Sequence, residues 1–132
     1  MSFTSECISF ITNNSCTNDD ENEVIALLSK ALPVSSSAIH WSRILKKEEF
    51  GKIQRDKLAI EINKIFTCMK LTPDEKLFII NIDDAFPAFR ASLREWLDFI
   101  DELDFTNTIF VSENRKTVIH WDFYMELHAT NI

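Results

Sequence analysis

Glycine is almost absent from this 132-residue chain, in which Gly51 is the only one. The phosphate-binding loops of P-loop proteins and of dinucleotide-binding domains need several glycines, because the backbone must approach the phosphates without an intervening Cβ. The sequence therefore excludes both kinds of loop. No other catalytic signature is recognisable in it.

Cysteine is also scarce and follows no pattern. Cys7, Cys16 and Cys68 form an odd set without C-x-x-C spacing, so the sequence predicts neither a disulfide framework nor a structural zinc site. Buried or incidental thiols of this kind are typical of a reducing cytosol.

Long apolar runs are missing as well. The N-terminus lacks a basic segment followed by an apolar stretch, so we predict no secretory signal. No apolar stretch approaches the roughly 20 residues that span a membrane. We therefore expect a cytoplasmic protein without a membrane partner.

Basic residues are outnumbered. The chain has 14 Lys and Arg against 21 Asp and Glu, a formal net charge of -7. Nucleic-acid binding depends on Lys and Arg neutralising phosphates, so nucleic acid is a poor partner for this chain. A basic protein is a better one, because complementary charge speeds association. The alternative interpretation is that the net charge only keeps the protein in solution.

Bulky apolar residues, by contrast, are abundant. Hydrophobic residues make up 45% of the chain and include eleven Phe and three Trp. This content argues against disorder, and the length allows a core that needs neither disulfides nor a metal. We expect residues 1–132 to form a single domain.

The C-terminal segment 117–128 has the clearest periodicity. Apolar residues occupy every second position, which predicts one continuous strand with an apolar face and a mostly polar, titratable face. The apolar set is Ile119, Trp121, Phe123, Met125 and Leu127, and the intervening set is Val118, His120, Asp122, Tyr124, Glu126 and His128.

Two earlier segments show helical spacing of apolar residues. Residues 20–32 are predicted to form a helix that Asn18 or Asp19 caps and Pro33 ends. Residues 54–70 carry a single apolar stripe and are predicted to form another.

The second half of the chain adds strands and a third helix. The short apolar run at 76–82 predicts a central strand covered on both faces. Residues 87–103 are predicted to form a helix, with Asp84 as its cap and Pro87 in its first turn. A strand at 108–112 should pair with the final strand as an antiparallel hairpin.

Two segments are left open. Residues 1–12 fit either a short strand or a helical turn, and residues 38–50 fit either a strand or a helix. The order of the remaining elements predicts an α+β fold of mixed layers: a small, largely antiparallel sheet with a C-terminal hairpin, covered by three to four helices.

The polar face of the final strand contains possible metal ligands or acid–base groups. On a straight strand of about 3.3 Å per residue, His120 and His128 would lie about 26 Å apart, too far to share one ion. We therefore expect no metal and no cofactor. Acid–base catalysis by His120 or His128, as in a small hydrolase or nuclease, is the enzymatic alternative.

Acidic residues gather around the helix predicted at 87–103. Asp83 and Asp84 precede it, and Asp98, Asp101 and Glu102 would share one of its faces at spacings of three and four. Like charges on one face are mildly unfavourable, and a basic partner would relieve the repulsion. An ordinary solvated face is the alternative.

Residues 76–128 resemble a known group of proteins. A strand that ends in acidic residues leads to an amphipathic helix with Trp96, and then to a hairpin that reads TIFVSEN, a short turn, and TVIHWDFYMEL. This order resembles the small immunity proteins of bacterial polymorphic-toxin and contact-dependent growth-inhibition systems. The resemblance implies a non-catalytic antitoxin in the cytoplasm that binds one cognate toxin domain, commonly a nuclease.

If the resemblance holds, the partner-binding surface should be acidic and should include an aromatic anchor. Tyr124 is the expected anchor, because Tyr and Trp dominate interface energetics. A non-catalytic adaptor domain remains an alternative. The expected contact residues are Asp83, Asp84, Asp98, Asp101, Glu102, Asp122, Tyr124 and Glu126.

Overall fold

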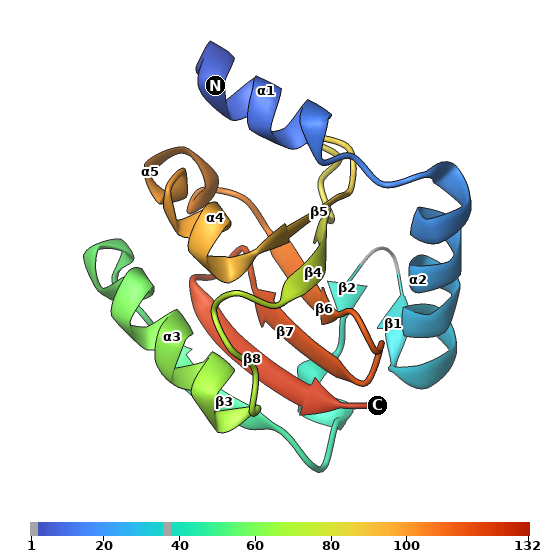
Figure 1. Ribbon diagram of the computed structural model, residues 1–132. Helices are drawn as coiled ribbons and strands as arrows, with labels where there is room; N and C mark the ends of the chain where they lie inside the picture. Colours follow the sequence, from blue (N-terminus) through green and yellow to red (C-terminus); the bar gives the residue numbers. More distant parts are fainter. Residues whose placement is uncertain (1–2, 36–37) are drawn as a thin grey trace.

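The computed structural model describes residues 3–35 and 38–132 and shows an α+β fold built on a six-stranded sheet (Figure 1). The α-helices of this part of the chain are α1 (Ser5–Asn13), α2 (Asn18–Ala31), α3 (Leu58–Cys68), α4 (Leu93–Leu97) and α5 (Ile100–Leu103), and the 3₁₀ helices are η1 (Trp41–Arg43) and η2 (Arg55–Lys57). The strands are β1 (Val34–Ser35), β2 (Ala38–Ile39), β3 (Glu48–Lys52), β4 (Lys76–Asn81), β5 (Phe89–Ser92), β6 (Thr108–Ser112), β7 (Thr117–Trp121) and β8 (Glu126–Asn131).

The six-stranded sheet is antiparallel throughout. Its strand order is β3-β8-β7-β6-β4-β5, in which β6, β7 and β8 form a meander of consecutive hairpins. β1 and β2 form a separate two-stranded ribbon. The predicted fold class is confirmed, and the described residues contain five α-helices where three to four were expected.

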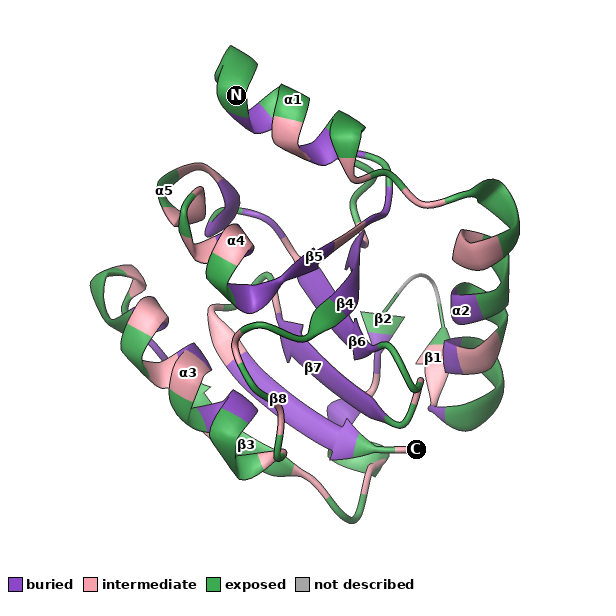
Figure 2. Ribbon diagram, in the orientation of Figure 1, coloured by how far each residue is buried: buried purple, intermediate pink, exposed green. Residues whose placement is uncertain are grey.

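Most residues of the central strands β6, β7 and β8 are buried (Figure 2), and apolar clusters pack on both faces of the sheet. In β4, Leu77 and Ile79 face a core packed by α1, α3, α4 and α5. Phe78 and Ile80 face a second core, under α2 and Trp41. A central strand between two layers has no solvent side, which explains the continuous apolar run at 76–82. The strands predicted at 76–82 and 108–112 are confirmed.

The prediction of one continuous strand over 117–128 is wrong. β7 ends at Trp121, a turn occupies residues 122–125, and β8 returns beside β7. The turn leaves the alternation intact, because Trp121 and Leu127 are direct cross-strand partners on the same face of the sheet. A period of two in the sequence therefore continues through a reversal of the chain.

The helix predicted over 87–103 is also wrong. Its first third is the edge strand β5, which pairs with β4, and the rest divides into α4 and α5. Ser92, and not Asp84, begins the helical part: its hydroxyl accepts from the Glu95 amide at 3.1 Å, and Glu95 reciprocates as a capping box. Apolar residues in β5 happened to continue the helical spacing of α4.

The first half of the chain follows the predictions more closely. The helix predicted at 20–32 is α2, but Thr17 caps it in place of Asn18 or Asp19, since Thr17 Oγ1 accepts from the Asp20 amide at 3.1 Å. The helix predicted at 54–70 consists of η2 and α3.

The two segments left open also have defined structure. α1 begins in segment 1–12 and ends one residue beyond it, at Asn13. Residues 1–2 of that segment are outside the described part. Segment 38–50 contains β2, η1 and the beginning of β3. In the described ranges, every helix is too short or too polar to cross a membrane.

Candidate functional site

Three connecting segments meet at one end of the sheet. The register aligns the last residues of β4 and β7 with the start of β6 and β8. The segments that follow or precede these positions therefore lie at the same end, which we call the loop end of the sheet. It consists of residues 82–88, 104–107 and 122–125.

Four acidic side chains of the predicted contact set are exposed and available to a partner. Asp83 and Asp84 are exposed in the segment after β4, and Asp101 is exposed on α5, which leads into residues 104–107. Asp98 is exposed at the C-terminus of α4. None of these four carboxylates has a salt bridge within 4.0 Å among the described residues.

Glu102 makes hydrogen bonds within the protein. Its carboxylate accepts hydrogen bonds from the Thr4 amide at 2.6 Å and from the Thr4 hydroxyl at 2.9 Å, which holds the start of α1 against α5. The single helical face expected for Asp98, Asp101 and Glu102 does not exist, because the helix is interrupted between α4 and α5.

Large aromatic side chains are exposed at the loop end. Phe123 is 74% exposed, Tyr124 72% and Phe105 52%. The rings of Phe123 and Tyr124 meet edge to face at 5.7 Å between centroids. Phe123 was expected on a buried apolar face, and its exposure follows from its position in the turn.

Arg55 supports the Phe105 side of this surface. Its guanidinium lies 3.1 Å from the centre of the Phe105 ring. It also donates to both oxygens of Asp104, at 3.0 and 2.8 Å. Phe105 and Phe123 line the same small pocket of about 140 Å³. Phe105 and Phe123 therefore pack against defined neighbouring side chains on one side while remaining exposed on the other.

The turn that presents Phe123 and Tyr124 is held by Asp122. One oxygen of its carboxylate accepts from the backbone amides of Tyr124 and Glu126, at 2.8 and 3.0 Å. The Met125 amide donates to the Asp122 carbonyl at 3.1 Å, and Met125 has a positive φ of 60°. A left-handed backbone conformation is unusual for methionine and is unfavourable. The hydrogen bonds that Asp122 accepts from the amides of the turn offset this cost.

The two histidines of the hairpin are direct cross-strand partners, with ring centroids 6.1 Å apart. The expectation of about 26 Å, based on one straight strand, is therefore wrong. His120 accepts from the Trp41 indole N–H at 2.8 Å through Nδ1, and its Nε2 lies 2.6 Å from Asn107 Oδ1. Burial lowers the pKa of His120 to about 4, so it is neutral at pH 7 with both nitrogens occupied.

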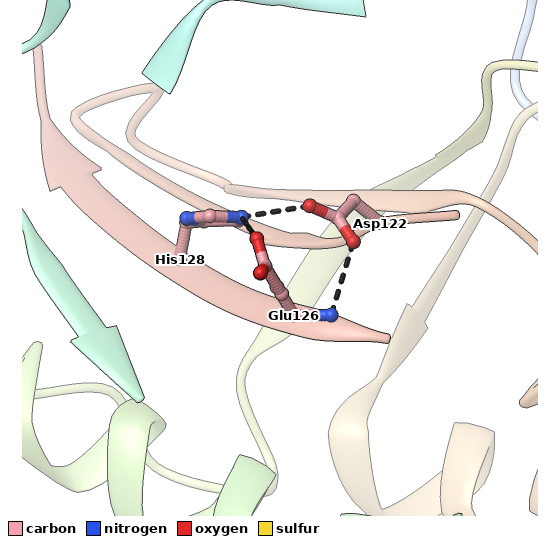
Figure 3. Close-up of side chains that lie close together, drawn as sticks. All are labelled: Asp122, Glu126 and His128. Carbon is pink, nitrogen blue, oxygen red and sulfur yellow. Dashed lines mark hydrogen bonds and ion pairs between the residues drawn. The ribbon is translucent and has the colours of Figure 1, made fainter. Parts of the chain in front are cut away.

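His128 is surrounded by carboxylates (Figure 3). Its Nδ1 lies 2.9 Å from Glu49 Oε2, and its Nε2 lies 2.8 Å from Asp122 Oδ2 and 3.7 Å from Glu126 Oε2. Trp41 stacks on the ring at 4.9 Å and 9° between planes. We call Asp122, Glu126 and His128 the carboxylate–histidine cluster.

Two of the acids beside His128, Asp122 and Glu49, have a lowered pKa, which favours the ionised form. Burial alone would raise the pKa of Asp122, but hydrogen bonds from His128 and from the Glu126 amide lower it overall. The hydrogen bond from Lys47 is the main cause of the lowered pKa of Glu49, with His128 contributing. The cluster therefore concentrates negative charge around one imidazole.

The predicted contact residues thus fall into two groups. Tyr124, the half-exposed Glu126 and the four exposed aspartates have side chains that a partner can reach, whereas Glu102 and Asp122 make hydrogen bonds within the protein. Sequence reasoning missed Phe105, Phe123 and Glu49 as parts of the site. A signal for Phe123 was present in the sequence, since Asp122 is a residue type that often begins turns.

Comparison with known proteins adds no relative: no protein-family model matches this chain, and a search of curated proteins found no match.

Proposed function

We propose that this chain is a non-catalytic, cytoplasmic immunity protein that binds a cognate toxin domain at the loop end of the sheet. The observation that supports this most is the exposure of Phe123 and Tyr124 on a turn that Asp122 holds in one conformation. Rigid aromatic side chains lose little conformational entropy on binding, and they dominate the energetics of many interfaces.

The charge of the surrounding surface indicates the kind of partner. Asp83, Asp84 and Asp101 are exposed without a salt bridge to another described residue. Toxin domains that cleave nucleic acids need basic surfaces to hold phosphates. An acidic inhibitor can cover such a surface, and its field speeds the encounter. We therefore infer a nuclease as the toxin.

The direct test uses the C-terminal domain encoded by the reading frame immediately upstream of this chain. Co-expression with this chain should restore growth that the domain alone prevents. In calorimetry, the two purified proteins should bind with a dissociation constant below about 100 nM. Absence of binding and of protection would contradict the proposed function.

Substitution of the aromatic pair locates the interface. Phe123→Ala combined with Tyr124→Ala should weaken binding at least 100-fold, because both side chains would be central anchors. Leu45→Ala is the matched control: Leu45 is 98% exposed, and the carbonyl of its neighbour Lys46 accepts a hydrogen bond from Thr130, at the opposite end of the sheet. An equal effect of the control would show that exposed apolar area in general, and not the loop end, drives binding.

Charge reversal tests the electrostatic part. Asp83→Lys should weaken binding about tenfold and make it less sensitive to salt, because rim charges act mainly through the association rate. Asp84 is a poorer choice because its φ of 55° makes substitution strained. Glu48→Lys is the control, since Glu48 is exposed and pairs with Ala129 away from the loop end.

A further inference from the structure

The geometry points to a binding site for one divalent transition-metal ion, such as Zn²⁺, in the carboxylate–histidine cluster. One donor atom from each of Asp122, Glu126 and His128 lies within 4.8 Å of the other two. Tetrahedral ligands about 2.0–2.2 Å from a zinc ion are about 3.3–3.6 Å from one another. The spacing of 3.7 Å from His128 Nε2 to Glu126 is close to this range, and the 2.8 Å contact with Asp122 would lengthen slightly to admit the ion.

The charge around His128 supports a cation at this place. A neutral imidazole has a single N–H, yet both ring nitrogens are within 2.9 Å of a carboxylate oxygen. One of the two contacts therefore needs additional positive charge, from a second proton or from a metal ion. A divalent ion at Nε2 would neutralise Asp122 and Glu126 and would leave the Nδ1 proton to Glu49.

Glu49 completes an arrangement that is common in metal sites. A metal-bound histidine usually donates its other N–H to a carboxylate, which fixes the ring and makes the ligand more basic. Glu49 is in this position, 2.9 Å from His128 Nδ1, and Lys47 holds Glu49 in turn at 2.9 Å. Trp41 stacks on the ring. His128 is thus oriented before any ion binds.

The donor set determines which metals suit the site. One imidazole nitrogen with two carboxylate oxygens favours first-row transition metals, whereas Mg²⁺ and Ca²⁺ prefer oxygen ligands alone. Among the ions compared below, Zn²⁺ should bind more tightly than Co²⁺. The Glu126 side chain is 45% exposed, so the site is open to water or to a ligand from a partner.

Bound metal would also act on the exposed turn. Asp122 and Glu126 stand immediately before and after Phe123, Tyr124 and Met125, so an ion that joins them closes the turn at its base. The inference does not depend on the proposed function, because its assay contains no partner protein.

The test is titration of the chelator-treated full chain with metal alone. Zn²⁺ should bind with one site per chain and a dissociation constant of about 10 μM or less, and it should raise the melting temperature. Co²⁺ should give visible absorption bands when bound. Mg²⁺ at 1 mM should not bind, and its titration should give no measurable heat. No saturable Zn²⁺ binding up to 1 mM would overturn the inference.

Three variants assign the site. Glu126→Gln should weaken Zn²⁺ binding at least tenfold while keeping the fold, since the Glu126 side chain is half exposed. Glu49→Gln should weaken it about 10- to 100-fold through His128. Glu48→Gln, at the exposed neighbouring position, should have no effect. Unchanged affinity in Glu126→Gln would show that the ion binds elsewhere and would overturn the assignment.

Discussion

The turn between β6 and β7 and the turn between β7 and β8 are built in the same way. In each, the fourth residue has positive φ, 61° at Arg115 and 60° at Met125. Its amide donates to the carbonyl of the first residue, Ser112 or Asp122, at 2.8 and 3.1 Å. The side chain of that first residue also accepts two hydrogen bonds from backbone amides of the turn or of the following strand.

The two turns differ in what they show to solvent. The first exposes Glu113 and Asn114, and Glu113 pairs with Arg90. The second exposes Phe123 and Tyr124. Since the polar turn has the same backbone, turn geometry does not require aromatic residues. Their exposure needs another reason, and a binding surface supplies one.

The largest difference should appear when the first residue of each turn is truncated. Asp122→Ala should lower the free energy of unfolding by about 3 kcal/mol, because it removes two charge-assisted hydrogen bonds to the turn and the hydrogen bond to His128 Nε2. Ser112→Ala should cost about 1 kcal/mol, since Asn114 also accepts from the Lys116 amide, at 3.0 Å. Urea denaturation with EDTA present measures both. Equal losses would show that the cluster adds nothing to the second turn.

The Trp41 indole joins the two histidines of the second hairpin, since it stacks on His128 and donates a hydrogen bond to His120. Trp41→Phe keeps an aromatic ring over His128 but removes the hydrogen bond to His120 Nδ1. It should cost about 1–2 kcal/mol, because the buried nitrogen loses its partner. Thermal and urea unfolding measure the loss. An unchanged stability would mean that water or another donor replaces the indole.

The sequence indicated most of the fold through periodicity. α2, β4 and the hairpin of β6 and β7 were predicted because apolar spacing and polar turns coincide there. The turn at 122–125 was missed for a physical reason. With one glycine in the chain, left-handed positions fall on other residue types, here Lys70, Asp84, Arg115 and Met125, so the glycine that usually marks such a turn is absent and Asp122 is the only signal.

Most of the candidate site depends on that missed turn. His120 and His128 are neighbours only because the chain reverses between them. Glu49 and Trp41 reach the histidines from 79 residues away in the sequence, and no local pattern predicts such contacts. Tyr124 was identified correctly as exposed, but from a strand face that does not exist.

Glycine substitutions at the left-handed positions of the two turns should change the free energy of unfolding in opposite directions. Arg115→Gly should raise the free energy of unfolding by about 0.5 kcal/mol, because relief of the steric penalty at positive φ outweighs the loss of the ion pair with Glu23 and of the contact with Phe78. Met125→Gly gains the same relief, but Met125 packs against the main core, and the lost packing should leave a net cost of about 1 kcal/mol. Urea denaturation distinguishes the two signs. A stabilised Met125→Gly would show that its packing contributes little.

The smallest effect should come from the ion pair of the first turn. Glu113→Gln removes the pairing with Arg90, in which both side chains are largely solvated, and should cost less than about 0.5 kcal/mol. Salt already screens this pair, so the cost should vanish in 1 M NaCl. The measurement is urea unfolding at 0.05 and 1 M NaCl. A loss above about 1 kcal/mol would mean that the first turn depends on side-chain partners as strongly as the second, and the contrast between the turns would then lie in their exposed surfaces alone.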